Sequence, residues 1–516
     1  MVHQAGGAQL IIRSARVVLP DGVRPASIHI SGGRITRVGA YDDQSAYDDR
    51  SAKADDRSAK ADESNARPDD RGAKALAERY AELIDFGDLV VSPGLVDTHV
   101  HVNEPGRTDW EGFDTATRAA AAGGVTAIVD MPLNSVPATT TVAAPEAKRA
   151  AARGRVHVDV GFWGGVVPDN AGELDALVEA GVRGFKCFLV PSGVPEFGAV
   201  DEADLRLALS VLARCDVPML VHAEAPQVIA ECGMRNADSN PQSNPQSAIR
   251  NPQYAMYLAS RPPRAEVEAI RMTIRLSRAL GARVHIVHVA CAEAVREIAD
   301  AKAAEVPITA ETCPHYLTFA AEDIPDRATE LKCAPPIREA RHRESLWDGL
   351  RRGALDMIAT DHSPAPPAMK CPGDFVRAWG GIASLELSLA AVWTAGTSRE
   401  LEVSTLKSQL SAPLRVESSE LRVDPCSLAF WMSERPAALA GLGARKGRIA
   451  TGFDADLVVW DPEASFVVEP SSLQQRHKLT PYAGRRLHGR VQTTFVRGAR
   501  VWDRNQLVCA HAGQLL

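Results

Sequence analysis

The feature that most constrains the fold is a regular alternation of strand-like and helix-like segments between Val90 and Leu439. Short apolar segments are expected to be strands, and they lie at residues 95–101, 125–131, 156–164, 184–189, 218–222, 283–288, 308–312 and 357–361. Segments rich in Ala, Leu, Glu and Arg separate most of them, as at residues 171–180, 201–213, 265–280 and 292–304. Eight strands with intervening helices predict an α/β fold, a (β/α)8 TIM-type barrel.

Both ends of the chain have a different pattern, in which short strands are joined by turns. Near the N-terminus we expect strands at residues 10–12, 16–19, 27–30 and 34–38, with Asp-Gly and Gly-Gly pairs at turn positions. Near the C-terminus we expect strands at residues 447–449, 456–460, 492–496 and 499–502. Because β-rich ends flank the barrel, residues 1–92 and 441–516 are predicted to form one small β-sandwich domain, with the barrel at residues 93–440.

Three segments interrupt these patterns. Residues 42–75 repeat a seven-residue unit of the type Asp-Asp-Arg-Ser-Ala-Lys-Ala, but no position of the unit carries a large apolar residue, which excludes a coiled coil. We interpret this segment, and the Asn-Pro-Gln-Ser repeats at residues 240–253, as disordered or loosely helical surface insertions. Residues 399–424 are polar and are expected to be a further irregular insertion.

Charge and composition exclude several classes of partner. A formal net charge of −7 gives no sign of nucleic-acid binding. The most apolar-looking stretch, residues 119–133, is broken by Thr126 and Asp130 and is too short for a membrane span. Residues 1–19 lack the pattern of a signal peptide. The nine cysteines include no Cys-x-x-Cys pair, which is typical of reduced thiols, so we expect a cytoplasmic protein.

Side chains that can bind metals or transfer protons lie at or near the C-terminal ends of the expected barrel strands. His99 and His101 alternate along one strand, so both point to the same face, ~7 Å apart. Four further expected strands supply one such residue each. The complete set from five strands is His99, His101, Lys186, His222, His288 and Asp361. Since active sites of (β/α)8 barrels lie at this end of the strands, these residues are predicted to form a metal site.

Lys186 has two interpretations. Burial in a barrel strand lowers the pKa of a lysine. A neutral amine can add CO2 to form a carbamate, which would bridge two metal ions ~3.5–4 Å apart. Alternatively, Lys186 forms a salt bridge with an acidic residue of the barrel. Composition alone favours neither interpretation.

Long, specific motifs lie at residues 99–113, 131–134, 186–189, 192–197, 311–317, 332–338, 379–386 and 477–482. They resemble those of the cyclic amidohydrolases of the amidohydrolase superfamily, and among them the allantoinase family. The resemblance covers nearly the whole chain apart from the insertions. It implies one metal held by His99, His101 and Asp361, a second held by His222 and His288, and carboxylated Lys186 (N6-carboxylysine) as a bridge. It further implies zinc, cobalt, manganese or iron as the metal, with zinc first, and a homotetramer.

The activity implied by the resemblance is hydrolysis of the hydantoin ring of (S)-allantoin to allantoate in purine degradation. The metal ions would activate water, and Asp361 would act as the catalytic acid and base. Asn103 stands where dihydroorotase-like enzymes place a carboxylate-binding arginine, and Val190-Pro191-Ser192 offers no tyrosine of the hydantoinase type. A hydantoinase or dihydropyrimidinase remains the alternative enzyme, and a non-catalytic scaffold of the same fold is the alternative from another class.

Predictions for the substrate contacts follow from the same resemblance. Backbone groups near Ala334 and Gly380 would contact the ring. Asn103 and Asn134 would bind ureido groups, or else stabilise loops through their amides.

Other candidate residues have ordinary structural explanations. His362 follows Asp361 and should face away from the site, while His315 either approaches the substrate or packs in the core. Cys187 should face a helix, and Cys291 and Cys313 are interpreted as buried thiols, because activated water needs no thiolate.

Overall fold

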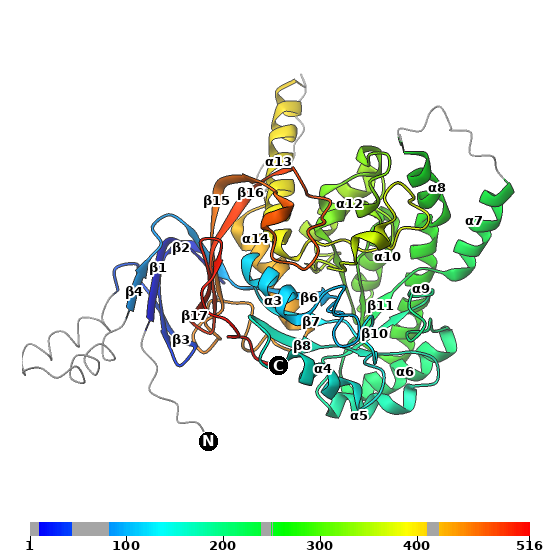
Figure 1. Ribbon diagram of the computed structural model, residues 1–516, viewed down its shortest axis with the longest axis horizontal. Coiled ribbons are helices and arrows are strands. Elements are labelled where there is room, and N and C mark those ends of the chain that lie inside the picture. Colours follow the sequence, from blue (N-terminus) through cyan, green and yellow to red (C-terminus); the bar gives the residue numbers. More distant parts are fainter. Residues whose placement is uncertain (1–9, 44–81, 239–248, 250, 410–422) are drawn as a thin grey trace, which may run out of the picture.

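The computed structural model describes residues 10–43, 82–238, 249, 251–409 and 423–516. Parallel strands form its centre in two groups (Figure 1). One group contains β6 (Leu95–Val100), β7 (Val125–Asp130) and β8 (Asp159–Phe162). The other contains, in spatial order, β14 (Met357–Ile358), β13 (Ile308–Thr312), β12 (Val284–Ile286), β11 (Met219–His222), β10 (Phe185–Phe188) and β9 (Gly164–Gly165).

The two groups join into a closed barrel. Trp163 alone separates β8 from β9, and its backbone N–H donates to the carbonyl of Asp130 in β7. On the other side, Val100 of β6 pairs in parallel with His362, which follows β14. The backbone N–H of His101 donates to the His362 carbonyl at 2.8 Å. Every residue of β6 and β7 is buried, as expected for parallel strands covered on both faces.

Helices cover the outside of the barrel (Figure 1). The α-helices of the described residues are α3 (Phe113–Ala122), α4 (Ala144–Ala152), α5 (Leu174–Glu179), α6 (Glu202–Cys215), α7 (Pro226–Asp238), α8 (Pro252–Ser260), α9 (Pro263–Leu280), α10 (Ala292–Ala303), α11 (Pro314–Thr318), α12 (Ala340–Arg351), α13 (Ser388–Gln409), α14 (Pro425–Ala429), which packs on the terminal sheet, and α15 (Arg435–Leu439). In α9 the buried residues Ile270, Thr273 and Ser277 form one stripe at helical spacing, and Gly281 ends the helix with φ 64°. No helix of the described residues is both long and apolar enough to cross a membrane.

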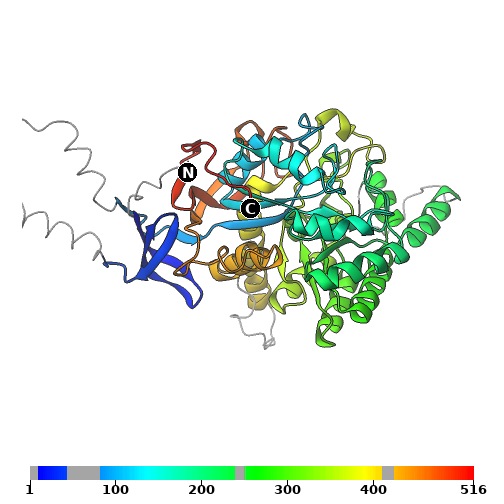
Figure 2. The same ribbon diagram turned by 90° about the horizontal axis from the view of Figure 1, so that it is seen from below.

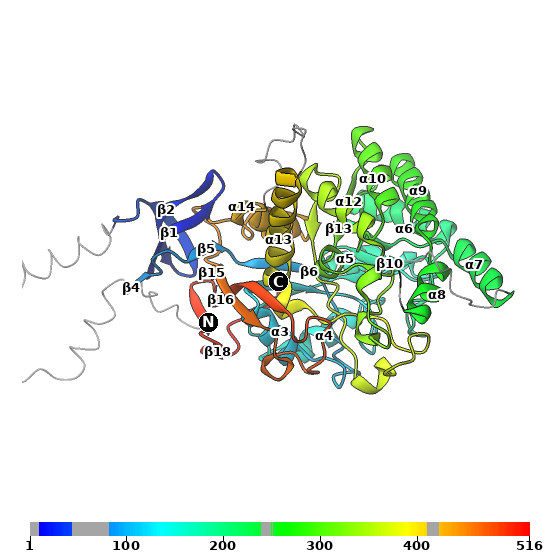
Figure 3. The same ribbon diagram turned by 90° about the horizontal axis from the view of Figure 1, so that it is seen from above.

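The two ends of the chain meet in one nine-stranded sheet beside the barrel (Figure 2). It contains β1 (Leu10–Leu19), β2 (Gly22–Ser31), β3 (Arg34–Gly39), β4 (Glu82–Asp85), β5 (Val90–Pro93), β15 (Leu457–Val467), β16 (Arg486–Val496), β17 (Ala499–Asp503) and β18 (Gln506–Leu507). Strand β5 connects the halves, because it pairs in parallel with β1 and antiparallel with β15 (Figure 3). Ile12, Val91, Leu457 and Phe495 from both ends share one buried cluster.

Most sequence-based expectations for the elements are confirmed, and four are corrected. The strands expected at residues 10–12 and 16–19 are the single strand β1, whose register with β2 shifts between Ser14 and Val17. Residues 447–449 do not form a strand, because Gly447 has φ 89° and bends the chain. The start of the polar segment 399–424 belongs to α13, and residues 410–422 lie outside the described part.

The fourth correction concerns the repeats. Asn251, expected in an insertion, caps α8 by accepting from the backbone N–H of Tyr254 at 3.0 Å, and Pro252 opens the helix. Residues 240–248 and 250 lie outside the described residues, as do residues 44–75 of the seven-residue repeat.

Candidate metal centre

A pocket with a volume of about 320 Å³ opens at the C-terminal ends of the barrel strands. Five of the six predicted metal ligands line it: His99, His101, His222, His288 and Asp361. They come from β6, from β11 and from the segments that follow β6, β12 and β14. The backbone of His288 (φ 41°) and of Asp361 (φ 47°) lies in the left-handed region, a costly conformation for residues other than glycine that concentrates at functional sites.

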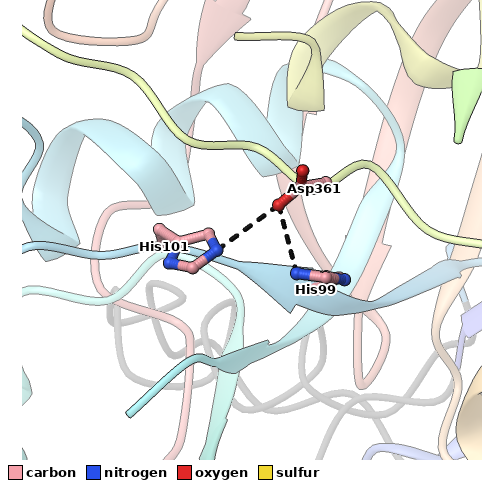
Figure 4. A group of neighbouring side chains, drawn as sticks. All are labelled: His99, His101 and Asp361. Carbon is pink, nitrogen blue, oxygen red and sulfur yellow. Dashed lines mark ion pairs between the residues drawn. The ribbon is translucent and has the colours of Figure 1, made fainter. Parts of the chain in front are cut away.

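The first group of ligands contains His99, His101 and Asp361 (Figure 4). Oδ1 of Asp361 lies 3.1 Å from Nε2 of His99 and 3.4 Å from Nε2 of His101. One ligand atom from each residue lies within 4.8 Å of the other two. Burial raises the pKa of Asp361, but the two histidines and His288 hold it well below its usual value. Burial lowers the pKa of His101 to about 4. Burial lowers the pKa of His99, but Asp361 and Glu311 raise it to about 9. A divalent cation here would bind the ionised carboxylate and neutral imidazoles, so its binding would displace the proton of His99.

The second group contains His222 and His288. Nδ1 of His222 lies 2.9 Å from Nε2 of His288, and the two rings are nearly perpendicular, at 73°. Burial lowers the pKa of both imidazoles. Both rings therefore turn a nitrogen toward the same point, which suits a second cation.

Buried carboxylates orient one histidine in each group. Nδ1 of His99 contacts Oε1 of Glu311 at 2.5 Å, and Nε2 of His222 contacts Oε2 of Glu224 at 2.8 Å. Both carboxylates are fully buried. A carboxylate behind a histidine fixes the ring and leaves the far nitrogen free for a metal. The sequence analysis assigned no role to Glu224 or Glu311. Strand parity is the signal that would have found Glu224, because it lies two residues after His222.

Lys186 is fully buried beside these ligands. Its Nζ has no hydrogen-bond partner and no ion pair among the described residues, so the salt-bridge alternative is not observed. The nitrogen lies 4.9 Å from the centre of the Phe188 ring. Burial lowers the pKa of Lys186 to about 8, although Asp361 and Glu311 raise it. An unpartnered amine of this kind fits the chemistry of a carbamate better than that of a structural cation.

The predicted substrate-contact residues do not all reach the pocket. Asn134, Ala334 and Gly380 line it. Asn103 is fully buried and does not line it, and neither atom of its amide has a hydrogen-bond partner. Asn134 has φ 70°, and its carbonyl accepts from Nη1 of Arg107 at 2.8 Å.

The other candidates lie outside the pocket wall. Nδ1 of His362 accepts from the backbone N–H groups of Ser384 and Leu385, both at 3.2 Å, so this ring faces away from the site. His315 is fully buried, and its ring packs 4.2 Å from the ring of Tyr316. The thiols of Cys187, Cys291 and Cys313 are buried, which raises their pKa.

Several residues of the wall are not predicted from the sequence, and they come from loops and from α8 and its C-terminal end. They include Tyr257, Arg261, Lys332, Ser363, Arg377 and Trp379. Arg261 donates to both oxygens of Glu224, and the hydroxyl of Tyr257 donates to the carbonyl of Cys333 at 2.7 Å. No spacing rule relates positions so far apart in the chain, so hydrophobic periodicity does not indicate that they meet in one wall.

A second group of carboxylates, Asp159, Asp454 and Asp456, also lies close enough to surround a cation. The ammonium of Lys446 occupies that place, at 2.7, 3.1 and 2.5 Å from the three carboxylates in that order. This cluster is a buried ion-pair network between the barrel and the terminal sheet.

Histidines and an aspartate gathered at the C-terminal mouth of a (β/α)8 barrel define the class of metal-dependent barrel hydrolases. The model of the amidohydrolase family matches residues 90–501, and the chain belongs to this family. An allantoinase of Streptomyces avermitilis is 44% identical over 96% of this chain and 95% of its own length. An allantoinase of Arabidopsis thaliana is 38% identical over 98% of this chain and 90% of its own length.

Solved structures confirm the fold. The L-hydantoinase from Arthrobacter aurescens has a TM-score of 0.81 with 28% identity over 99% of both chains. The dihydropyrimidinase from Brevibacillus agri has a TM-score of 0.78 with 27% identity over 98% of both chains. The predicted barrel with a β-sandwich domain built from both chain ends is thus confirmed, and so is the predicted family.

Proposed function

We propose that this protein is an allantoinase that opens the hydantoin ring of (S)-allantoin to give allantoate in purine degradation. The observation that carries the proposal is the 44% identity to the Streptomyces avermitilis allantoinase over nearly the full length of both chains. The pocket supports it, because two groups of metal-competent side chains converge there.

The proposed metal centre contains two divalent cations. His99, His101 and Asp361 would hold one, His222 and His288 the other, and Lys186 would join both as N6-carboxylysine after addition of CO2. The unpartnered, fully buried Nζ of Lys186 and the paired nitrogens of His222 and His288 support this assignment. When bound, such a pair of cations supplies an activated water and polarises the ring carbonyl.

The protein's own groups perform the proton transfers and the positioning. Asp361, ionised in its buried site, accepts the proton of the attacking water as the new C–O bond forms. It then donates that proton to the ring nitrogen as the C–N bond breaks, so the carbonyl becomes a carboxylate and the nitrogen remains in a ureido group. Backbone groups at Ala334 and Gly380 would hold the ring, and Asn134 a ureido group. Asn103, which does not line the pocket, would support the pocket wall from behind.

Further assignments belong to the same proposal. Zinc is the first choice of metal, with cobalt, manganese or iron as alternatives, since the ligand set suits all four. The assembly is a homotetramer in the cytoplasm. The domains are residues 1–92 with 441–516 for the β-sandwich and residues 93–440 for the barrel.

Hydrolysis assays with allantoin, hydantoin and dihydrouracil test the proposal. We expect allantoin to be turned over with the highest kcat/KM. Asp361→Asn should abolish turnover, whereas Asp348→Asn, a change at an exposed aspartate of α12, should not. Rapid opening of dihydrouracil without turnover of allantoin would instead establish a dihydropyrimidinase. Fewer than about one metal per chain after expression with added metal and CO2 would favour the non-catalytic scaffold.

A further inference from the structure

One wall of the pocket contains two consecutive glycines after a tryptophan. Trp379, Gly380 and Gly381 all line the cavity. A Cβ on Gly380 would meet no atom within 4 Å, so this residue leaves open space beside the wall. A Cβ on Gly381 would instead lie 2.3 Å from the carbonyl oxygen of Ser363, and Gly381 has φ 133°. The wall is therefore held close to the strand end that carries Asp361, and its open side is at Gly380.

A buried lysine holds this wall from behind. Lys370 is 5% exposed, and its Nζ donates to the carbonyl of Trp379 at 3.1 Å and to the carbonyl of Gly381. These two carbonyls flank Gly380. No carboxylate forms an ion pair with Lys370 in the part of the chain that the structure describes. A buried ammonium is costly unless its hydrogen bonds are satisfied, so its bonds to these carbonyls strongly restrain the backbone.

Backbone hydrogen bonds and the Trp379 ring also hold the wall, residues 379–381, in place. The backbone N–H of Gly381 donates to the carbonyl of Lys332 at 2.8 Å, and that of Trp379 donates to the carbonyl of Met369 at 2.8 Å. Across the pocket, a Cβ on Gly193 would lie 3.1 Å from the Trp379 ring. A displaced wall would therefore move the indole against the opposite loop and change the width of the pocket.

We propose that Lys370 is a positioning residue for the substrate, and that Gly380 is the point at which the wall leaves room for the substrate. Lys370 acts by fixing the backbone of Trp379 to Gly381. The inference rests on the proposed function only in its choice of allantoin as the first substrate. It does not depend on the metal ligands, because Lys370 contacts none of them.

Kinetics of metal-loaded enzyme test this role. Lys370→Met keeps most of the side-chain volume and removes the ammonium. We expect KM for allantoin to rise ~10-fold, with kcat and metal content nearly unchanged, because uniform binding is lost. Gly380→Ala should also raise KM, since its methyl group occupies the open space, without changing metal content. Lys302→Met is the matched control, because Lys302 pairs with Asp356 at the other end of the barrel, and it should leave KM unchanged.

The dependence of KM on pH gives a readout that a purely structural role would not move. Burial lowers the pKa of Lys370 to about 8, while Cys333 and Glu330 raise it and Lys332 lowers it further. Above pH 8 the ammonium loses its proton and its hydrogen bonds to the carbonyls weaken. KM of the wild type should therefore rise above pH 8, and the Lys370→Met variant should lack this component.

Hydrogen exchange at residues 377–381 provides a test without turnover. We expect faster exchange there in Lys370→Met than in the wild type and in Lys302→Met. An unchanged KM together with unchanged exchange would overturn the proposal, as would equal losses of kcat and metal. If Lys370→Met does not fold, KM of Gly380→Ala and the pH profile of KM for the wild type decide whether the proposal holds. If the wild type opens hydantoin or dihydrouracil but not allantoin, the proposed function fails, and Lys370 is tested with the accepted substrate.

Discussion

Replacing the carboxylate behind His222 tests how the second metal position is built. Glu224 is fully buried, and its Oε2 accepts from Nε2 of His222 at 2.8 Å. Arg261 donates from Nε to Oε1 at 3.0 Å and from Nη2 to Oε2 at 2.5 Å. With its proton held on Nε2, His222 presents the lone pair of Nδ1 toward His288. Glu224→Gln keeps the shape of the side chain and removes its charge.

Two separate costs follow from this substitution. Burial raises the pKa of Glu224, but Arg261 and His222 lower it to about 2, so the wild-type group is an anion at neutral pH. Loss of such a partner typically weakens metal binding by ~10–100-fold, or about 1.4–2.7 kcal/mol. Arg261, whose side chain is 19% exposed, also loses its counter-charge. Breaking a buried pair on one side costs ~3–5 kcal/mol of unfolding free energy.

The double variant Glu224→Gln/Arg261→Met separates the two costs. It leaves no unpaired guanidinium, so stability should largely return, while metal affinity should stay low. Metal content after dialysis against buffered free zinc measures the affinity, and chemical denaturation measures the stability. Glu231→Gln is the control, since its solvent-exposed pair with Arg264 should contribute little to stability. Wild-type affinity at both metal positions in Glu224→Gln would refute the reasoning.

Three further predictions concern the core, the thiols and the metals. Arg338→Met leaves the buried carboxylate of Glu266, which lies 2.5 Å from the guanidinium, without its counter-charge. The substitution should lower the unfolding free energy by ~3–5 kcal/mol, and a loss under ~1 kcal/mol in chemical denaturation would contradict this. Cys313→Ala should retain turnover within a few-fold, because burial keeps the pKa of the thiol well above its usual value; a complete loss of turnover with normal metal content would indicate a thiolate. Chelation should abolish ring opening and lower Tm, and added zinc should restore both; full activity of metal-free protein would exclude the proposed centre.

The sequence predicts which candidate ligands meet at the pocket, because their positions follow from strand geometry. His99 lies in β6 and His101 directly follows it, with the spacing of two that alternation requires, and His222 ends β11. The closed barrel then brings these strand ends together without any further information. The expected strands at residues 10–12 and 16–19 show the limit of the same rule. The register shift between Ser14 and Val17 joins them into one strand, and alternation does not indicate such a shift.

Substrate recognition is less predictable because the pocket walls come from segments that no periodicity relates. Tyr257 lies in α8 and Arg261 directly follows it, Lys332 and Ala334 precede α12, and Trp379 lies on a loop. Their arrangement depends on tertiary bonds such as that from Tyr257 to the Cys333 carbonyl, which no local signal in the chain indicates.

The hydantoinase of Arthrobacter aurescens shares the fold over 99% of both chains at 28% identity, so the barrel itself does not select the ring that is opened. In this chain the metal-competent side chains lie at strand ends, whereas Gly380, Trp379 and their anchor Lys370 lie on one loop after β14. A change in that loop can alter substrate choice while the metal site stays intact. Exchange of this loop with that of a hydantoinase should therefore shift the ratio of kcat/KM for allantoin and hydantoin and leave metal content unchanged. Loss of metal in the exchanged protein would show that wall and metal site are coupled.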